Sequence, residues 1–522
     1  MDQLPYETWL QILSYLTTSD AENLATLNRT LFDLTLSSRY RSINIECLDT
    51  RTVRLVRHLK NDYIARHVRS FAISEWAVDQ LLFREARDQR VHRSSLKSRA
   101  SAQISVLKNL HWHRTSKLTR ESKFIIPPES QWWSVDSPKP SYHVIEDLDH
   151  ALQSLHNVDS FGFSWKSERT DMSCIRTAWR TFGPNLRTLH IHTSDKNLSM
   201  ILSDAIGLTR LEDLSVSLCR EGEIQHLSET GQTALLASLT SFVNQHSKSL
   251  KVISISSCLH LNLAPLFSSL DLLDQIEDIH LHLPFDENHV SDGTSLVKFL
   301  NSHRQSIRLL SLHQLACSSG CAHSRETGVE VCKRLLRDLN LPYLKSLEIA
   351  LHPFIDAVDI FLLIQHVYTR LQSLRSKTSF LSLLVIKKLL SAFTQTSLSP
   401  PLRHLYLPVQ SVTKELIDIL ASTFPSLISV EFLLPHRGAI AMINQEPFVA
   451  EMSVARADYS FWNLSNFAIS YYKVNDELCY STTSMVALAN YVPSIQTFER
   501  RFNDDRLMYT CSHDMTPKYR GW

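Results

Sequence analysis

The sequence predicts an α/β protein in which a small N-terminal module of three helices precedes an irregular solenoid of parallel strands plus helices. Three observations support this fold class. Apolar residues recur at helical spacing near the N-terminus, a six-residue apolar pattern recurs along most of the chain, and glycine is scarce, with 10 residues in 522. Because glycine usually makes up about 7% of a protein, the scarcity argues against the glycine-rich phosphate loops of nucleotide-binding enzymes.

The first 45 residues carry the signals of three short helices. Pro5 suits a first helical turn, and Glu7 lies where the helix dipole favours a carboxylate. Ser19 and Glu22 have the spacing of a capping box, which predicts the start of a second helix. A third helix is expected to end near Leu36, before a short strand at 40–45. The apolar face of the first helix consists of Trp9, Ile12, Leu13 and Leu16.

The segments LPYETWLQILSYL, SDAENLATLNRTLFDL and RYRSI resemble an F-box, especially that of fungal F-box proteins, although Tyr6 stands where many members have a second proline. The resemblance implies a partner, the Skp-type adaptor of a cullin ubiquitin ligase. Short helices with more than one apolar face need a partner to cover them. The alternative is a small helical cap on the rest of the chain. Residues expected to include the adaptor contacts, with some of them holding the helices together instead, are Leu4, Pro5, Glu7, Ile12, Leu13, Leu16, Leu24, Leu27 and Leu31.

A pattern of the form apolar-x-x-apolar-x-apolar recurs along the remainder of the chain. It resembles the core of an irregular leucine-rich repeat, in which each unit is one strand followed by a helix. Helical periodicity over 235–247, 357–374 and 412–424 suits the helices of such units. The alternative is a globular α/β fold of unrelated units. The pattern occurs as VRSFAI (68–73), VDSFGF (158–163), LRTLHI (186–191), LEDLSV (211–216), LKVISI (250–255), IEDIHL (276–281), IRLLSL (307–312), LKSLEI (344–349), LRHLYL (402–407), LISVEF (427–432) and LSNFAI (464–469).

These patterns divide the chain into five parts. One part interrupts the repeats: it is basic and rich in serine, and we interpret it as a partly flexible insertion. The five parts are the F-box (1–45), a first repeat-like segment (46–83), the basic insertion (84–150), the leucine-rich-repeat array (151–470) and a C-terminal cap or tail (471–522).

Polar residues between the apolar positions of the repeats are candidates for binding a client protein. Side chains alternate along a strand, so these residues are expected to share the face opposite the core. Serines fill many of these positions, and the larger side chains are histidines and a tyrosine. The alternative for each is the ordinary polar surface that any such strand needs. The candidates are His190, His192, His280, His282, His313 and Tyr406.

No catalytic or cofactor motif stands out, so we expect no enzyme and no cofactor. The signatures G-x-S-x-G, G-x-x-x-x-G-K-[ST], H-E-x-x-H and the dinucleotide fingerprint are absent. His313, Cys317, Cys321 and His323, with Cys332 beyond them, form a metal-like group. Their spacing does not match the paired ligands of zinc sites, and a polar loop with free thiols is the default interpretation.

The amino-acid composition limits the kinds of binding partner and the cellular compartment that we expect. The chain has 54 Lys and Arg against 53 Asp and Glu, which gives no reason to expect nucleic acid. It has no apolar run of the ~20 residues that span a membrane, and its first residues lack the basic and apolar regions of a signal peptide, so we expect neither a membrane partner nor a secretory leader. Nine dilute cysteines are typical of reduced thiols, so we expect a cytoplasmic and/or nuclear protein.

The resemblance implies a substrate-receptor subunit of a Skp–cullin–F-box E3 ubiquitin ligase. The F-box would bind the Skp-type adaptor, and through it a cullin, while the repeats would bind an unknown client protein. The alternative function is a leucine-rich-repeat scaffold for protein interactions that has no ubiquitin-ligase role.

Overall fold

The computed structural model divides the chain into two compact units, Met1–Arg187 with Asp204–Arg210, and Thr188–Ser203 with Leu211–Trp522. No helix among the described residues is long and apolar enough to cross a bilayer. The described residues are 6–17, 20, 29–47, 49–74, 77, 144–165, 173–205, 207–219, 229–291, 293–315, 323–351, 360, 363–364, 367, 369–377, 380–394, 400–435, 450, 459, 461–472, 488 and 492–503. Of the basic insertion predicted at 84–150, residues 84–143 lie outside them, and a helix begins at Val144.

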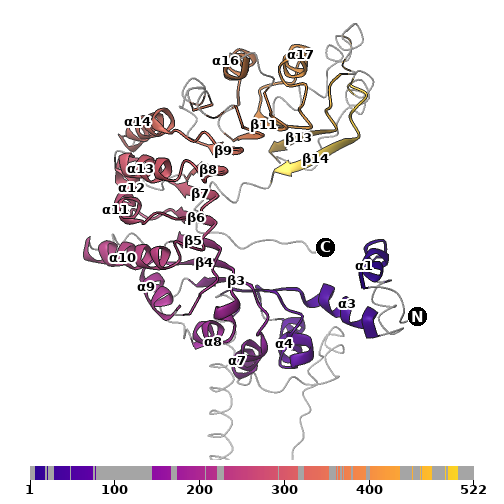
Figure 1. The fold of residues 1–522 in the computed structure, drawn as a ribbon, viewed down its shortest axis with the longest axis vertical. Helices are drawn as coiled ribbons and strands as arrows, with labels where there is room; N and C mark the ends of the chain where they lie inside the picture. Colours follow the sequence, from indigo (N-terminus) through magenta and orange to yellow (C-terminus); the bar gives the residue numbers. More distant parts are fainter. Residues whose placement is uncertain are drawn as a thin grey trace, which may run out of the picture. The chain divides into compact units, whose positions relative to one another are not determined.

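The first unit alternates helices with short parallel strands (Figure 1). Strand β1 pairs with β2 and β2 pairs with β3, so that Ile43, Phe71 and Phe161 lie side by side. The short strand expected at 40–45 is therefore the first strand of a sheet. The elements are α1 (Tyr6–Ser14), α3 (Arg29–Tyr40), β1 (Ser42–Ile45), α4 (Thr50–Leu59), α5 (Asp62–Ala65), β2 (Ser70–Ser74), α7 (Val144–Ser154), β3 (Ser160–Trp165), α8 (Ser173–Phe182) and the 3-10 turn η3 (Gly183–Asn185).

An aromatic cluster around Phe161 forms the core of the first unit. The ring centroid of Phe161 lies 5.1 Å from that of Phe182, 5.7 Å from that of Trp179 and 6.2 Å from that of Phe71. All four side chains are buried. Two of these rings come from parallel strands and two from α8, so the cluster joins the sheet to the helix that covers it.

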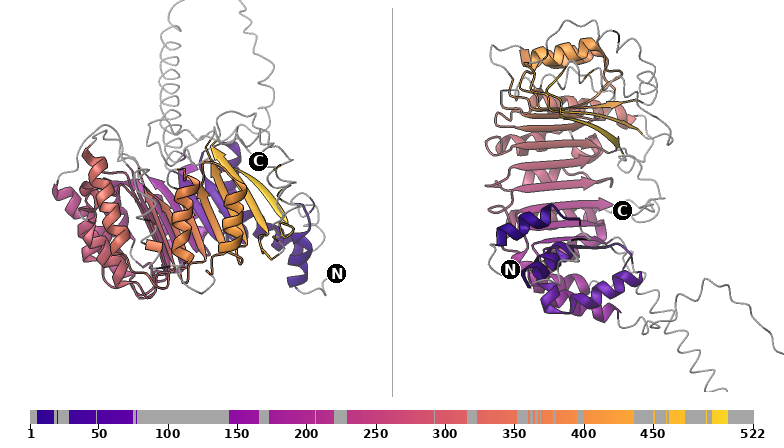
Figure 2. Two further views of the ribbon diagram at one scale, coloured as in Figure 1. Left: turned by 90° about the horizontal axis from the view of Figure 1, so that it is seen from above. Right: turned by 90° about the vertical axis from the view of Figure 1, so that its right-hand side faces the viewer.

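The second unit repeats one arrangement, a parallel strand followed in most repeats by a helix on the same face of the sheet (Figure 2). Neighbouring strands in the chain are neighbours in the sheet throughout. Its elements are β4 (Thr188–Ser194), α9 (Asp195–Asp204), β5 (Asp213–Cys219), α10 (Glu229–Gln245), β6 (Val252–Ser257), α11 (Ala264–Ser269), β7 (Asp278–Leu283), α12 (Glu287–Val290), α13 (Thr294–Ser302), β8 (Leu309–Gln314), α14 (His323–Asp338), β9 (Ser346–Ala350), β10 (Ser373–Ser376), α16 (Leu383–Thr394), β11 (His404–Pro408), α17 (Lys414–Thr423), β12 (Ser429–Leu434), β13 (Asn466–Tyr472) and β14 (Thr497–Asn503).

The predicted leucine-rich-repeat type of solenoid is confirmed. Each of the six-residue motifs forms a strand that begins at the third motif residue. The first motif residue, such as Ile276 or Leu344, precedes the strand and is fully buried, while the other two apolar positions point from the strand into the core. The motif therefore predicts where each strand begins and which face of that strand is buried.

Three helix boundaries differ from those expected. Helix α10 begins at Glu229, six residues before the helix expected over 235–247. The helix predicted over 357–374 is wrong at its end, because residues 369–370 form a turn and β10 begins at Ser373. The motif there, LQSLRS, ends in serine instead of an apolar residue, although Ser376 is buried. Helix α3 continues to Tyr40, past the expected end near Leu36. Strand β14 lies in the part interpreted as a cap or tail and extends the parallel ladder.

A shared backbone acceptor links each strand to the next. The carbonyl oxygen of Glu277 accepts from the amides of Arg308 and Leu309 at 2.7 and 3.1 Å. The carbonyl oxygen of Lys251 accepts from the amides of Glu277 and Asp278 at 2.8 and 3.0 Å. The same pair of bonds recurs at the starts of β2, β3 and β6 to β14. It fixes the register of each strand before the strand ladder begins.

Asparagine side chains form a second link between repeats. Asn301 donates to the carbonyl of Asp338 at 3.0 Å and accepts from the amide of Asn340 at 2.9 Å. Asn244 makes the equivalent bonds to Ser269 and Asp271 two repeats earlier in the array. Each asparagine therefore satisfies a donor and an acceptor in the turn that follows the next helix.

We expect Asn301→Ala to lower the free energy of unfolding by about 1–3 kcal/mol, since it leaves two backbone groups without their partner. Thermal unfolding followed by circular dichroism measures the effect. Gln305→Ala, an exposed residue close by, is the matched control and should leave the midpoint unchanged. Equal midpoints for Asn301→Ala and wild type would contradict the linking role.

Candidate functional site

The N-terminal helices pack together through a small apolar core. Trp9 of α1 and Leu31 and Leu34 of α3 are buried against one another, and Ile12 packs against this cluster. Leu31 is thus an internal residue among those expected to include adaptor contacts. Glu7 is exposed and Leu16 is half-buried. Leu4, Pro5, Leu24, Leu27, the predicted second helix and the side chain of Leu13 lie outside the described part of the chain.

Three large apolar side chains near this core face solvent. Leu10 is 47% exposed, Tyr15 is 81% exposed and Phe32 is 43% exposed. Leu10 follows Trp9 directly, so the two side chains leave α1 in different directions and only one reaches the core. None of these three residues was predicted as an adaptor contact. They can be recognised in the sequence as large apolar residues that do not lie on the apolar face of the predicted helix.

A polar joint ties helix α3 to the segment before β2. The Tyr63 hydroxyl donates to Asp33, and the Arg66 Nη2 atom lies 3.1 Å from Asp33 Oδ1. The Arg66 guanidinium also lies 3.9 Å from the centroid of the Tyr63 ring. The hydrogen bond to Asp33 raises the pKa of Tyr63. Ser37 and His67 add a contact of 2.7 Å between the same two segments, so several bonds hold α3 on the first repeat.

In the second unit, the polar strand positions form two rows on the face opposite the helices. Strand register places each residue directly beside its neighbour on the next strand. The first row runs His190, Ser215, Ser254, His280, Ser311, Glu348, Arg375 and Tyr406. The second row runs His192, Ser217, Ser256, His282, His313 and Ala350.

On β5 and β6, both rows consist of small side chains, which together form a strip. Ser215, Ser217, Ser254 and Ser256 occupy it, with histidines on β4 and β7 at its two sides. The Nδ1 atom of His192 lies 2.9 Å from Ser217 Oγ, so one serine is engaged by a flanking imidazole. Burial raises the pKa of Asp213 and of Asp278, which lie at the strand-start end of this strip.

A charged cluster occupies the same face from β7 to β10. The imidazole rings of His282 and His313 stack with centroids 4.4 Å apart and an angle of 14° between planes. The Nε2 atom of His313 lies 3.1 Å from Glu348 Oε1, outside the geometry of a hydrogen bond. The Nζ atom of Lys377 lies 3.2 Å from the same oxygen. Glu348 is therefore the anionic centre of the cluster.

Burial and neighbouring charges set the protonation of this cluster. Burial, with smaller contributions from His313 and His280, lowers the pKa of His282 to about 4. Burial alone would raise the pKa of Glu348, but contact with His313 and the charges of His313, Lys377 and Arg375 outweigh it and lower the pKa to about 2. At neutral pH His282 is uncharged and Glu348 is ionised.

The structure places all six predicted client-contact residues in the two rows, beside charged groups that were not predicted to contact a client. His190, His192, His280, His282 and His313 lie in the two rows. Tyr406 lies in the first row, but it is only 6% exposed and the Arg375 guanidinium lies 5.1 Å from its ring centroid. Glu348 holds the motif position that holds His280 in β7, so the same spacing rule finds it. Arg375 lies beside Glu348 in the row, but its motif ends in Ser376 and escapes the rule.

No group of three or more metal-ligating side chains has the geometry of a metal site within the described ranges. Cys317 and Cys321 of the metal-like group lie outside those ranges. Cys332 is 1% exposed, and burial raises the pKa of its thiol. Because metals bind the thiolate, this burial disfavours Cys332 as a ligand.

Acidification should destabilise the second unit through His282. Its folded-state pKa of about 4 lies below its usual 6.5, so its contribution is complete above pH 6.5 and is lost as the pH falls toward 4. Between pH 7 and pH 5 the loss amounts to about 1–2 kcal/mol. His282→Gln should reduce the drop in thermal midpoint over this range, whereas His404→Gln, at an exposed position, should not. Identical drops in all three proteins would rule out the contribution of His282.

No family model matches the chain, and no curated protein matches it. Among solved structures, it is similar to a chain in the crystal structure of the Rad7 and Elc1 complex in yeast, with a TM-score of 0.33 and 15% sequence identity. The match covers 58% of this chain and 76% of that chain.

Proposed function

We propose that this chain is the substrate-receptor subunit of a Skp–cullin–F-box ubiquitin ligase. The observation that carries the proposal is the exposure of Leu10, Tyr15 and Phe32 on or beside helices that already bury Trp9, Leu31 and Leu34 in their own core. The F-box resemblance of the same residues supplies the partner, a Skp-type adaptor, and through it a cullin.

The energetics of these helices support a docked partner. The two described helices share a core of only a few side chains, and an apolar core of this size is marginal by itself. Burying an exposed leucine or tyrosine in an interface contributes about 1.5–3 kcal/mol. An adaptor that covers the three exposed side chains would stabilise both the helices and the complex.

The joint between α3 and the first repeat gives the proposed subunit a defined geometry. Tyr63, Arg66 and His67 hold Asp33 and Ser37 of α3, so an adaptor bound to the helices is held at a set angle to the first repeats. The chain itself would catalyse nothing. Its contribution is proximity, since it would hold a client lysine near the charged ubiquitin-conjugating enzyme.

The two polar rows of the second unit are the proposed client surface. They combine an uncharged strip of serines and histidines with the charged cluster around Glu348. A surface of fixed strands loses little conformational freedom on binding, which favours a defined partner.

The double variant Leu10→Ala, Tyr15→Ala should lose adaptor binding at least tenfold, because both side chains are exposed in the free chain and covered in the complex. Co-expression with a Skp-type adaptor, followed by size-exclusion chromatography and calorimetry, measures the change. Since neither residue lies in the apolar core of the helices, the thermal midpoint of the free chain should stay the same.

The matched control is Leu272→Ala, Leu384→Ala, which removes two exposed leucines from the second unit and should retain full adaptor binding. A wild-type chain that ignores the adaptor, or a double variant that binds it normally, would rule out the proposed docking face. The variant Leu4→Ala, Pro5→Ala, Leu13→Ala tests the residues that the resemblance alone implicates.

A second candidate function is a repeat scaffold that binds a protein partner and has no ubiquitin-ligase role. The polar rows support it equally, because they do not depend on the N-terminal helices. The two functions differ in one measurement: a receptor bound to its adaptor also recruits a cullin, whereas the scaffold does not.

A further inference from the structure

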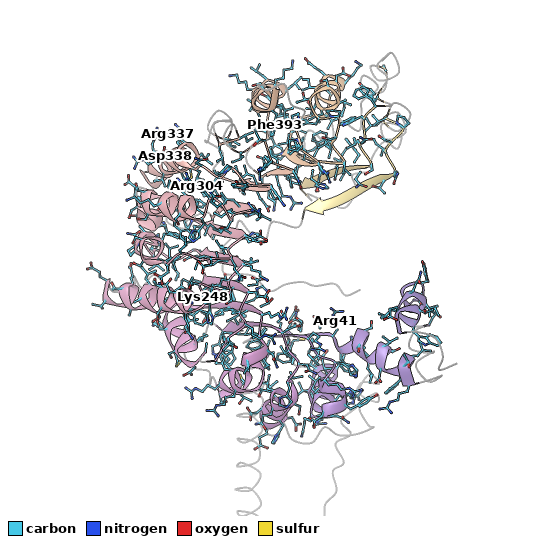
Figure 3. All side chains as sticks on the ribbon, viewed as in Figure 1. Arg41, Lys248, Arg304, Arg337, Asp338 and Phe393 are labelled. Atoms are coloured by element: carbon cyan, nitrogen blue, oxygen red, sulfur yellow. The ribbon has the colours of Figure 1, made fainter. Side chains whose placement is uncertain are left out.

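The residue that precedes each strand of the second unit forms a row of its own, which we call the strand-start row. Its backbone carries the shared acceptors described above, so consecutive members are one strand spacing, about 4.8 Å, apart. The turns that lead into this row include Lys248 and Arg304 (Figure 3). From β5 to β11 the strand-start row reads Glu212, Lys251, Glu277, Arg308, Lys345, Gln372 and Arg403.

Charge is divided along the strand-start row. In its first part, acidic and basic residues alternate, and Lys251 Nζ lies 2.9 Å from Glu212 Oε2. From β8 onward the charged members are all cations: Arg308, Lys345 and Arg403. Arg370, in the turn before β10, adds a fourth. Lys345, Arg370 and Arg403 are exposed, and Arg308 is half-buried.

Arg308 and Arg370 share one aromatic ring. The guanidinium carbon of Arg370 lies 4.3 Å from the centroid of the Tyr343 ring, and that of Arg308 lies 5.2 Å from it. The Nη1 atom of Arg308 also donates to the carbonyls of Gln305 and Tyr343, at 3.1 and 3.5 Å. These contacts hold Arg308 in place and leave most of its five N–H groups for a ligand.

These four cations form no ion pair with any carboxylate in the described part of the chain. Glu277 precedes Arg308 in the strand-start row, yet Arg308 turns to Tyr343 on the other side. By contrast, Arg375 and Lys377, on the face of the sheet opposite the helices (the open face), both form ion pairs with Glu348. Four unpaired cations across about 15 Å repel one another and attract an anionic ligand.

We propose that the strand-start edge from β8 to β11 binds an acidic segment, rich in Asp and Glu, of a protein partner. The edge spans three strand spacings, which matches four or five residues of extended chain. Arginine forks pair with carboxylates through two parallel bonds, and Arg308 is held ready for such a pair. The site ends at β8, because Glu277 before β7 and Glu212 before β5 would repel an acidic segment. The acidic character of the partner follows from the cations of this edge alone. Its identity as the client of a ubiquitin ligase rests on the proposed function.

The probe is a fluorescein-labelled peptide of alternating glutamate and serine, eight residues long, titrated with the full chain in a fluorescence anisotropy assay at 50 mM and 200 mM salt. Arg308→Gln, Arg370→Gln should weaken binding at least tenfold. The control Lys298→Gln, Lys388→Gln removes the same charge from exposed positions on α13 and α16 and should leave binding within twofold of wild type. Higher salt should weaken wild-type binding.

Equal affinity in the Arg308, Arg370 variant and in its control would overturn the proposal. So would equal binding of the peptide with glutamine in place of glutamate, binding only of a phosphoserine version, or preference for an oligouridine of the same length. Adaptor binding measured on the same samples keeps the two proposals apart. Normal adaptor binding by the Leu10, Tyr15 variant would contradict the receptor function only. Peptide binding by the Arg308, Arg370 variant tests the acidic-segment site only.

Discussion

The shared carbonyl acceptor at the strand starts is the constraint on which the array depends. At β2, β3 and β6 to β14, one oxygen accepts two consecutive amides of the next repeat, so these strands enter the sheet at the same residue of the motif. A slip by one residue would turn leucines outward and histidines into the core. Because the register is fixed at this point, the intervening loops and helices vary in length without disturbing the sheet.

Fixed register turns a repeating sequence into rows of chemically distinct side chains. On the open face, serine and histidine give way to the cluster around Glu348, where burial keeps His282 neutral and surrounding positive charge keeps Glu348 ionised. Along the strand-start edge, paired charges give way to unpaired cations around Tyr343. The same backbone thus presents two surfaces with different preferences for a partner.

The N-terminal helices obey another constraint. Trp9, Leu31 and Leu34 are enough to hold α1 against α3, but they leave Leu10 and Tyr15 in solvent. The joint of Tyr63 and Arg66 with Asp33 supplies what so small an apolar core lacks, a firm attachment to the first repeat. An apolar surface and a rigid attachment are the two requirements of a docking module.

The amino-acid sequence by itself determined the strands and the face each one buries, because the period-two alternation and the buried residue ahead of each strand are local signals. It missed β10 and β14, because Ser376 and Arg500 stand where the motif requires an apolar residue. It also did not distinguish Leu31, which is internal, from residues that face a partner. Only the tertiary structure decided that His282 stacks on His313 beside Glu348, and that two arginines share Tyr343. These contacts join residues 27 to 35 positions apart, and their chemistry depends on burial and on neighbouring charge, which no local pattern encodes.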